Sequence, residues 1–447
     1  MWESFIETVT KVNDWVNGVV WGWPMIVMIL GTGILLTVRT KVLQVRKFGE
    51  SLSSTIVPVV KGLGKKQGKR DKNSISQFEA FSAAISGTVG TGNIIGVTSA
   101  ILTGGPGAVM WMWISAFVGM VTNYSENVLG LYYRRKEKDG SFSGGAFYYI
   151  AYGLKQNWLG LFAAVFCLLA ATGMSGVQTN KITGSFISVL NTDETWVKLL
   201  IGSVVALFAA VVIIGGIKRI GRIASMLVPF MSVLFIMMSF IIIGKNIGAV
   251  PETFRLIFSS AFSAKAVAGG VGGFVFSQII KKGLARGVFS NEAGLGSSVI
   301  AHSASETREP VKQGLWGIFE VFFDTFVICT LTALVVLTTN IGNGSYENGS
   351  FFGTTNAAGE FVGASDSATS LSAFSSNLGT FGTVTFLTIL PLFAFTTILA
   401  WSYYGEKAMD FCFRNTSEKA RKNATMIFKV AYILLIVFSS LIGSDLI

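Results

Sequence analysis

Long apolar segments alternate with short polar loops along almost the whole chain. A helix needs about 20 mostly apolar residues to cross a bilayer, and ten segments of the sequence meet this requirement. Residues 2–12 also place apolar side chains at helical spacing, which predicts a short helix at the membrane surface. The predicted spans are 14–38, 76–101, 106–133, 158–190, 197–216, 223–244, a span that begins near 264, 315–340, 379–405 and 426–443.

The composition agrees with a polytopic, all-α membrane protein. Of the 447 residues, 51% are hydrophobic and only 13% are charged, and the mean hydropathy is +0.60. Soluble proteins carry about 25% charged residues. The three cysteines have unrelated spacings, which predicts neither a disulfide framework nor a metal site.

The net charge of +11 is concentrated in loops between apolar segments, which argues against nucleic-acid binding. The densest basic loop covers 39–72, whereas 341–375 contains no Lys or Arg. By the positive-inside rule, the basic loops are cytoplasmic and the N-terminus is outside. The same rule predicts that Lys281, Lys282 and Arg286 lie at the cytoplasmic end of the span that begins near 264. We therefore expect a multi-pass protein of the cell membrane.

One apolar segment contains the sequence SGTVGTGNIIG, residues 86–96. Its four glycines each lower helix propensity by about 1 kcal/mol relative to alanine, so we predict a broken helix. A break that lines a buried cavity can present N–H groups to an anion and C=O groups to a cation. The alternative is that the glycines only allow close helix packing.

A second glycine cluster, 269–273, predicts a second broken span that enters the membrane from the opposite side. Matching breaks of opposite orientation are typical of inverted repeats with a binding site between them. The two repeats are predicted at 76–244 and 263–443.

Helix ends suggest the ligands that such a site would bind. The N–H groups of Gly90, Thr91 and Gly92 suit a carboxylate. Oxygen atoms suit sodium, and the candidates are the carbonyls of Ser86 and Val89, the amide of Asn93, and the hydroxyls of Thr396 and Thr397. The alternative for the threonine pair is a bond to the carbonyl one turn earlier in the same helix.

Three acidic residues fall within predicted spans: Glu126, Glu320 and Asp324. Charge at this depth is costly, so these side chains either bind protons or cations or make structural bonds to other helices. With one histidine, no metal-ligand cluster and no GxxxxGK[ST] sequence, neither an enzyme nor an ATP-driven pump is expected.

Three runs of sequence resemble those of a known family. They are GGPGAVMWMWISAFVG at 104–119, TVGTGN at 88–93 and GVFSNEAGLGS at 287–297. Together they resemble the alanine or glycine:cation symporters, also called sodium:alanine symporters, over about residues 10–440. The chain departs from the family after residue 443, where a final helix with Asn-Gly and Pro-Asn patterns is missing.

The resemblance implies a five-plus-five inverted-repeat bundle like that of the leucine transporter, with one extra N-terminal helix. It also implies a sodium site, a carboxylate site at Gly90–Gly92, and Asn93 close to the substrate. The implied sodium site consists of Ser86, Val89, Thr396 and Thr397. The implied pocket wall consists of Phe274, Phe276, Ser277 and Gln278, with Gln178 and Met174 as further candidates.

The function implied is sodium-coupled uptake of alanine, glycine and similar small neutral amino acids by alternating access. Sodium is then a co-transported ion and not a prosthetic group, and the partners are the amino acid, sodium and the bilayer. Moving one charge across the membrane yields about 2.3 kcal/mol per 100 mV, which supports roughly 50-fold accumulation. The alternative is proton-coupled transport through Glu320 or Asp324.

Overall fold

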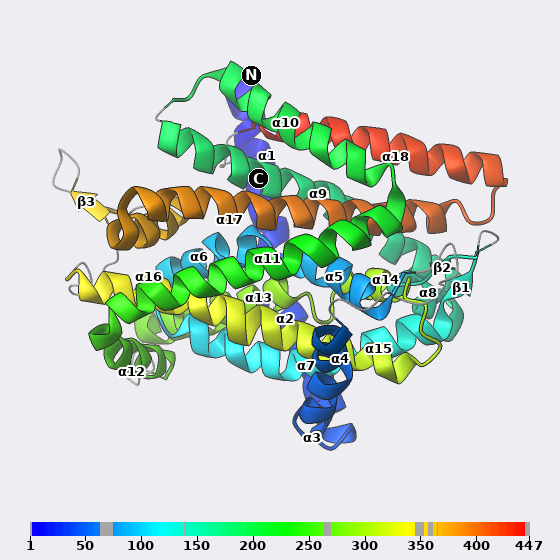
Figure 1. Ribbon diagram of the computed structural model, residues 1–447, viewed down its shortest axis with the longest axis horizontal. Coiled ribbons are helices and arrows are strands. Elements are labelled where there is room, and N and C mark those ends of the chain that lie inside the picture. Colours follow the sequence, from blue (N-terminus) through cyan, green and yellow to red (C-terminus); the bar gives the residue numbers. More distant parts are fainter. Residues whose placement is uncertain are drawn as a thin grey trace.

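The computed structural model describes residues 2–62, 75–137, 140–190, 192–262, 270–344, 353–355, 361–363 and 365–442. The described chain is mainly helical (Figure 1). Two small antiparallel hairpins, β1 (Arg135–Lys136) with β2 (Phe142–Ser143) and β3 (Gly353–Thr355) with β4 (Phe361–Gly363), lie in loops.

The N-terminal third contains the first broken span. Its elements are α1 (Trp2–Val20), α2 (Trp23–Arg39), α3 (Leu43–Arg46), α4 (Phe48–Gly62), α5 (Gln77–Thr88), η1 (Thr91–Asn93), α6 (Ile95–Gly104) and α7 (Ala108–Tyr133). The predicted surface helix at 2–12 is not separate, because α1 continues to Val20. The helix ends where Gly22 adopts an extended conformation before Pro24.

The remaining elements complete the bundle. They are α8 (Ala146–Tyr148), η2 (Tyr149–Gly153), α9 (Asn157–Leu190), α10 (Thr195–Ile213), α11 (Gly216–Lys245), η3 (Ile247–Ala249), α12 (Val250–Ala261), α13 (Gly270–Asn291), α14 (Ser298–His302), α15 (Pro310–Val321), η5 (Phe322–Cys329), α16 (Thr330–Gly342), α17 (Asp366–Cys412) and α18 (Glu418–Ser439). In Figure 1, α10 and α18 lie along one edge, α7 and α15 lie toward the other, and α17 and α11 cross between them.

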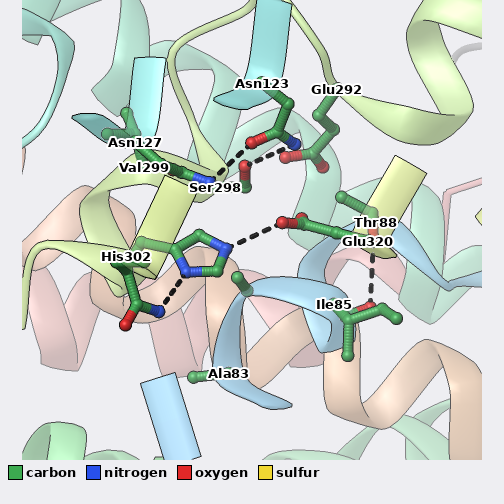
Figure 2. A network of polar contacts seen from close by, with 12 residues as sticks. Ala83, Ile85, Thr88, Asn123, Asn127, Glu292, Ser298, Val299, His302 and Glu320 are labelled. Carbon is green, nitrogen blue, oxygen red and sulfur yellow. Dashed lines mark hydrogen bonds and ion pairs between the residues drawn. The ribbon is translucent and has the colours of Figure 1, made fainter. Parts of the chain in front are cut away.

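Seven of the described helices are long and apolar enough to cross a membrane, and the bent pair α5–α6 makes an eighth. The other two predicted spans correspond to α7 and α13, which have 26 and 22 residues and are not among these eight. Helix α7 carries the buried amides of Asn123 and Asn127 (Figure 2).

The first predicted break is confirmed. A capping box of Ser76 and Glu79 begins α5, and the axis then bends by 57° between α5 and the segment Thr91–Gly104. Val89 and Gly90 leave the helical region, with ψ of 90° and −160°. Close helix packing explains one glycine of this run, because a Cβ on Gly87 would lie 2.7 Å from the Tyr404 hydroxyl of α17.

The second break exists, but the prediction that placed it at 269–273 is wrong for the described residues. Gly270–Asn291 forms one helix, and the break follows it at 292–297. Glycine tolerates helical angles, whereas Glu292, Gly294 and Gly296 have φ of 55°, 92° and 73°, which no helix accepts. Gly269 lies outside the described residues.

The two ends of the bundle are marked by Arg134 and by Lys282. At the Arg134 end, Ile75 pairs with Ser305. At the Lys282 end, the side chain of Lys282 packs beside Gly104, where α6 ends. The prediction that Lys281, Lys282 and Arg286 share an end with the loop after α7 is therefore wrong. The positive-inside rule applies to flanking loops, whereas these residues lie within α13.

Candidate functional site

The first break is closed by an asparagine side chain from its own backbone segment. Gly90 N–H donates to Oδ1 of Asn93 at 2.9 Å. Asn93 is fully buried, and its N–H continues a short helical turn by bonding the Gly90 carbonyl. The amide therefore bridges the break and fixes its geometry, and its Nδ2 group is directed to Ser290 and Asp324 on other helices.

Gln178 of α9 reaches the same break from the other side. Its Oε1 accepts from Thr91 N–H at 3.2 Å and from the Thr91 hydroxyl at 2.9 Å. Of the three N–H groups predicted to hold a carboxylate, those of Gly90 and Thr91 thus bond amide oxygens here. A carboxylate can replace Gln178 because both groups offer an oxygen acceptor to the same donors.

Thr397 of α17 also contacts the break. A Cβ on Gly90 would lie 2.6 Å from Thr397 Oγ1 and 3.3 Å from Gln178 Nε2, so α17 and α9 both contact the break at this glycine. Thr397 donates to the Phe393 carbonyl at 3.0 Å, which is the bond to the carbonyl one turn earlier that was the alternative to sodium binding.

The other members of the predicted sodium site are buried but differently placed. Thr396 lies near Met231 of α11, with its hydroxyl 3.7 Å from the sulfur, and also bonds carbonyls of its own helix. Ser86 donates to the Ala83 carbonyl at 2.8 Å within α5, and Val89 ends that helix. Thr397 is therefore the threonine nearer to Gly90.

A buried carboxylate completes the polar environment of the break. Asn93 Nδ2 donates to Oδ1 of Asp324 at 2.5 Å and to the Ser290 hydroxyl at 3.1 Å. The Thr325 hydroxyl donates to the other Asp324 oxygen at 2.9 Å. Asp324 lies in η5, a π-helical stretch, and such stretches often occur at functional sites.

Arg286 of α13 fills a notch in the helix that follows the break. Its guanidinium donates to the Gly92 carbonyl and lies where a Cβ on Gly96 would be. It also borders a cavity of about 510 Å³ between α1, α6 and α13 that includes Lys281 and Lys282. This guanidinium links the break in the first span to the helix that precedes the second break.

The structure does not bring all predicted residues to the break. Met174 is partly buried in the apolar cluster around α9, α17 and α18. Ser277 and Gln278 lie in α13 about 13.5 and 12 Å along the helix axis from Arg286, at 1.5 Å per residue. Phe274 and Phe276 belong to the same helix, and their side chains lie outside the described residues.

The positions of Arg286 and Ser290 beside the first break were not predicted from the sequence, whereas Asp324 was predicted to bind a proton or cation or to make a structural bond to another helix, and it bonds Asn93. The run NEAGLGS, residues 291–297, was a detectable signal of the second break, because its two glycines follow a helix-length segment. Among the described residues, no group of three or more His, Cys, Asp or Glu side chains could hold a metal ion.

Solved structures with the same arrangement are transporters. The structure of MhsT in complex with L-phenylalanine matches with a TM-score of 0.56 at 16% identity, covering 84% of this chain and 81% of that one. A sodium-coupled sialic acid symporter in a substrate-bound, outward-open state matches with a TM-score of 0.55 at 10% identity, covering 94% and 82%. The fold is therefore the leucine-transporter-like helical bundle.

The chain belongs to the sodium:alanine symporter family, whose model matches residues 6–447. It is 39% identical to the sodium/alanine symporter AgcS of Methanococcus maripaludis, over 91% of this chain and 84% of that protein. It is 38% identical to YrbD of Bacillus subtilis, a putative sodium/proton-dependent alanine carrier, over 90% and 79%. The probable sodium/glutamine symporter GlnT of the same organism is 35% identical, over 94% and 80%.

Proposed function

We propose that this protein is a secondary active symporter that couples sodium entry to uptake of small neutral amino acids such as alanine and glycine. The observation that carries the proposal is the convergence of Gln178, Thr397 and Asn93 on the broken backbone at Gly90 and Thr91. The sodium/alanine symporter AgcS supports the choice of ion and substrate.

The site matches the chemistry of a zwitterion. Thr91 N–H and hydroxyl would bind the substrate carboxylate once Gln178 turns aside, and Asp324 would attract the ammonium group through its place beside Asn93. Sodium would bind the carbonyls of Ser86 and Val89 with the hydroxyls of Thr396 and Thr397. A zwitterion is neutral, so each sodium ion carries one net charge inward.

The proposed topology follows the charge distribution. The basic loops after α2 and α7 would face the cytoplasm, and the N-terminus would lie outside the cell membrane. Residues 76–244 and 263–443 would form two inverted repeats, each opened by one of the broken spans. During transport, the helices that flank the two breaks would open alternately to each side.

Uptake of labelled alanine into proteoliposomes tests the function directly. We expect accumulation above the external concentration when an inward sodium gradient is present, and none when external sodium is replaced by choline at constant pH. Equal uptake in sodium and choline would contradict sodium coupling.

Proton coupling is the second candidate, and the buried Asp324 carboxylate beside Asn93 is the observation that favours it. The name of YrbD, which includes both sodium and proton, points the same way. An inward proton gradient in sodium-free choline medium distinguishes sodium coupling from proton coupling. It drives alanine uptake only if the protein couples proton entry to alanine entry.

Replacing Thr396 and Thr397 together by alanine tests the sodium site. Loss of two hydroxyl ligands is expected to raise the half-saturating sodium concentration at least about tenfold. If each hydroxyl contributes about 1 kcal/mol to sodium binding, as a hydrogen bond does, the loss of both exceeds the 1.4 kcal/mol that corresponds to tenfold in affinity. Sodium titration of alanine uptake measures this. Thr388→Ala is the matched control, because Thr388 is exposed on α17 and bonds only its own helix carbonyl. An unchanged sodium requirement in the double variant would show that the ion binds elsewhere.

A further inference from the structure

The cavity of about 510 Å³ between α1, α6 and α13 has a strongly cationic lining. Lys281, Lys282 and Arg286 all border it from α13, and none of the described residues that line it is acidic. The hydroxyl side chains of Ser99 and Thr103, on α6, also line it. Pockets for small organic molecules typically measure roughly 300–1,000 Å³, so the cavity is large enough for such a ligand.

The positive charges of this cavity lack partners within the described part of the chain. Neither Lys281 nor Lys282 has a hydrogen bond or an ion pair with any described residue. Arg286 donates from Nη2 to the Gly92 carbonyl, and its Nε is buried without a partner. Lys282 and Arg286 are also four residues apart on α13, and like charges at this spacing destabilise a helix. A bound anion would offset this repulsion.

Two acidic side chains interact with Arg286 electrostatically, but each is bonded to a different side chain. They are Asp324 of η5 and Asp366 at the start of α17. Asp324 accepts from the Asn93 amide, and Asp366 pairs with Lys181 of α9 at 3.6 Å. The described chain therefore supplies no carboxylate to the cavity itself.

The walls of the cavity favour a carboxylate that carries an apolar group. A guanidinium is planar and matches the geometry of a carboxylate. Trp21 and Phe289 form an edge-to-face pair at the wall, with 5.8 Å between ring centroids, and aromatic rings offer a large apolar contact area. A zwitterionic amino acid suits the cavity poorly, because its ammonium group would meet cationic side chains and no acid.

We propose that this cavity is a binding site for small organic carboxylates that lack an ammonium group. The carboxylate bonds Arg286 beside the two lysines, and the apolar part of the ligand contacts Trp21 and Phe289. The site is separate from the groups proposed for the amino acid and sodium. Because Arg286 also bonds the Gly92 carbonyl, an occupant of the cavity competes with the broken span for this guanidinium.

Equilibrium dialysis of radiolabelled benzoate against the purified full chain in detergent tests the site, because benzoate has a carboxylate, an aromatic ring and no ammonium group. At low ionic strength, saturable binding of one molecule per chain is expected. The double variant Lys281→Gln with Lys282→Gln should raise the Kd at least about tenfold, since it removes two charges that attract the anion. Arg255→Gln is the matched control, because Arg255 is exposed on α12 and pairs with Glu252; its Kd should equal that of the unmodified protein.

A further variant tests the guanidinium itself. Arg286→Lys keeps the positive charge but loses the planar fork, so the Kd for benzoate should again rise at least about tenfold. The double lysine variant keeps the test decisive if Arg286→Lys does not fold, because neither lysine has a partner among the described residues whose loss would weaken the fold.

Competition experiments identify the site that benzoate occupies. A large excess of alanine should leave benzoate bound, whereas displacement would place benzoate in the amino-acid site and overturn the proposal. Displacement by phosphatidylglycerol but not by phosphatidylcholine would assign the cavity to a lipid headgroup instead. A lack of saturable binding, or an unchanged Kd in the double lysine variant, would also overturn the proposal. Failed alanine uptake with intact benzoate binding would overturn only the proposed function.

Discussion

Gly90→Ala is expected to lower sodium-driven alanine uptake by about 10- to 100-fold. The added Cβ would lie 2.6 Å from Thr397 Oγ1 and 3.3 Å from Gln178 Nε2, so it would push apart the helices that meet at the break. Such overpacking costs about 1–3 kcal/mol, and each 1.4 kcal/mol is tenfold in affinity. Initial rates in proteoliposomes, normalised to the amount of inserted protein, measure the effect.

The chain offers matched controls on one of the helices at the same site. Gly173 and Gly184 lie in α9 on either side of Gln178, and a Cβ on either would meet nothing within 4 Å. Gly173→Ala and Gly184→Ala should therefore keep uptake within about twofold of the unmodified protein, since surface changes usually stay within 0.5 kcal/mol. Normal uptake by Gly90→Ala would mean that the break is not the transport site.

Asp324→Asn is expected to raise the KM for alanine by about 30-fold or more. Asparagine preserves the shape and can still accept a hydrogen bond from Asn93, but it removes the negative charge that would attract the substrate ammonium group. Truncating one partner of a buried charge pair costs about 2–5 kcal/mol. Concentration series of alanine uptake at saturating sodium give KM and the maximal rate separately.

Asp193→Asn is the control for this change. Asp193 lies exposed in the loop before α10 and pairs with Lys198 of that helix. Its KM should be unchanged. If Asp324→Asn altered only the pH dependence of uptake and left KM for alanine unchanged, Asp324 would bind a proton and not the ammonium group.

The helical spans were predictable because apolar length is a strong signal. The predicted span 158–190 corresponds to α9 (Asn157–Leu190), and the predicted 106–133 corresponds to α7 (Ala108–Tyr133). The first break was also predictable, since helix propensity falls sharply over 86–96. The same reasoning failed at 270–273, where glycines remain helical. The amino-acid composition of a segment sets its intrinsic helix propensity, but tertiary contacts can stabilise a helix even where that propensity is low.

The site was only partly predictable because its members come from separate helices. Thr397 and Gln178 meet at Gly90 only through the packing of α17 and α9 against the break. Arg286 illustrates the limit. The positive-inside rule predicts that it lies at the cytoplasmic end of a span, whereas its side chain enters a notch made by Gly92 and Gly96. Such a notch depends on the crossing of two helices, which no local pattern records.

The Arg286 side chain also restricts how the helices can move. Because the guanidinium fills the space beside Gly96 and bonds the Gly92 carbonyl, α6 cannot slide along α13 unless the arginine first withdraws. We therefore expect α6 and α13 to rotate together as one rigid unit about the breaks at their ends. A rotation shared by both helices keeps the guanidinium beside Gly96, whereas sliding of one helix along the other would remove it.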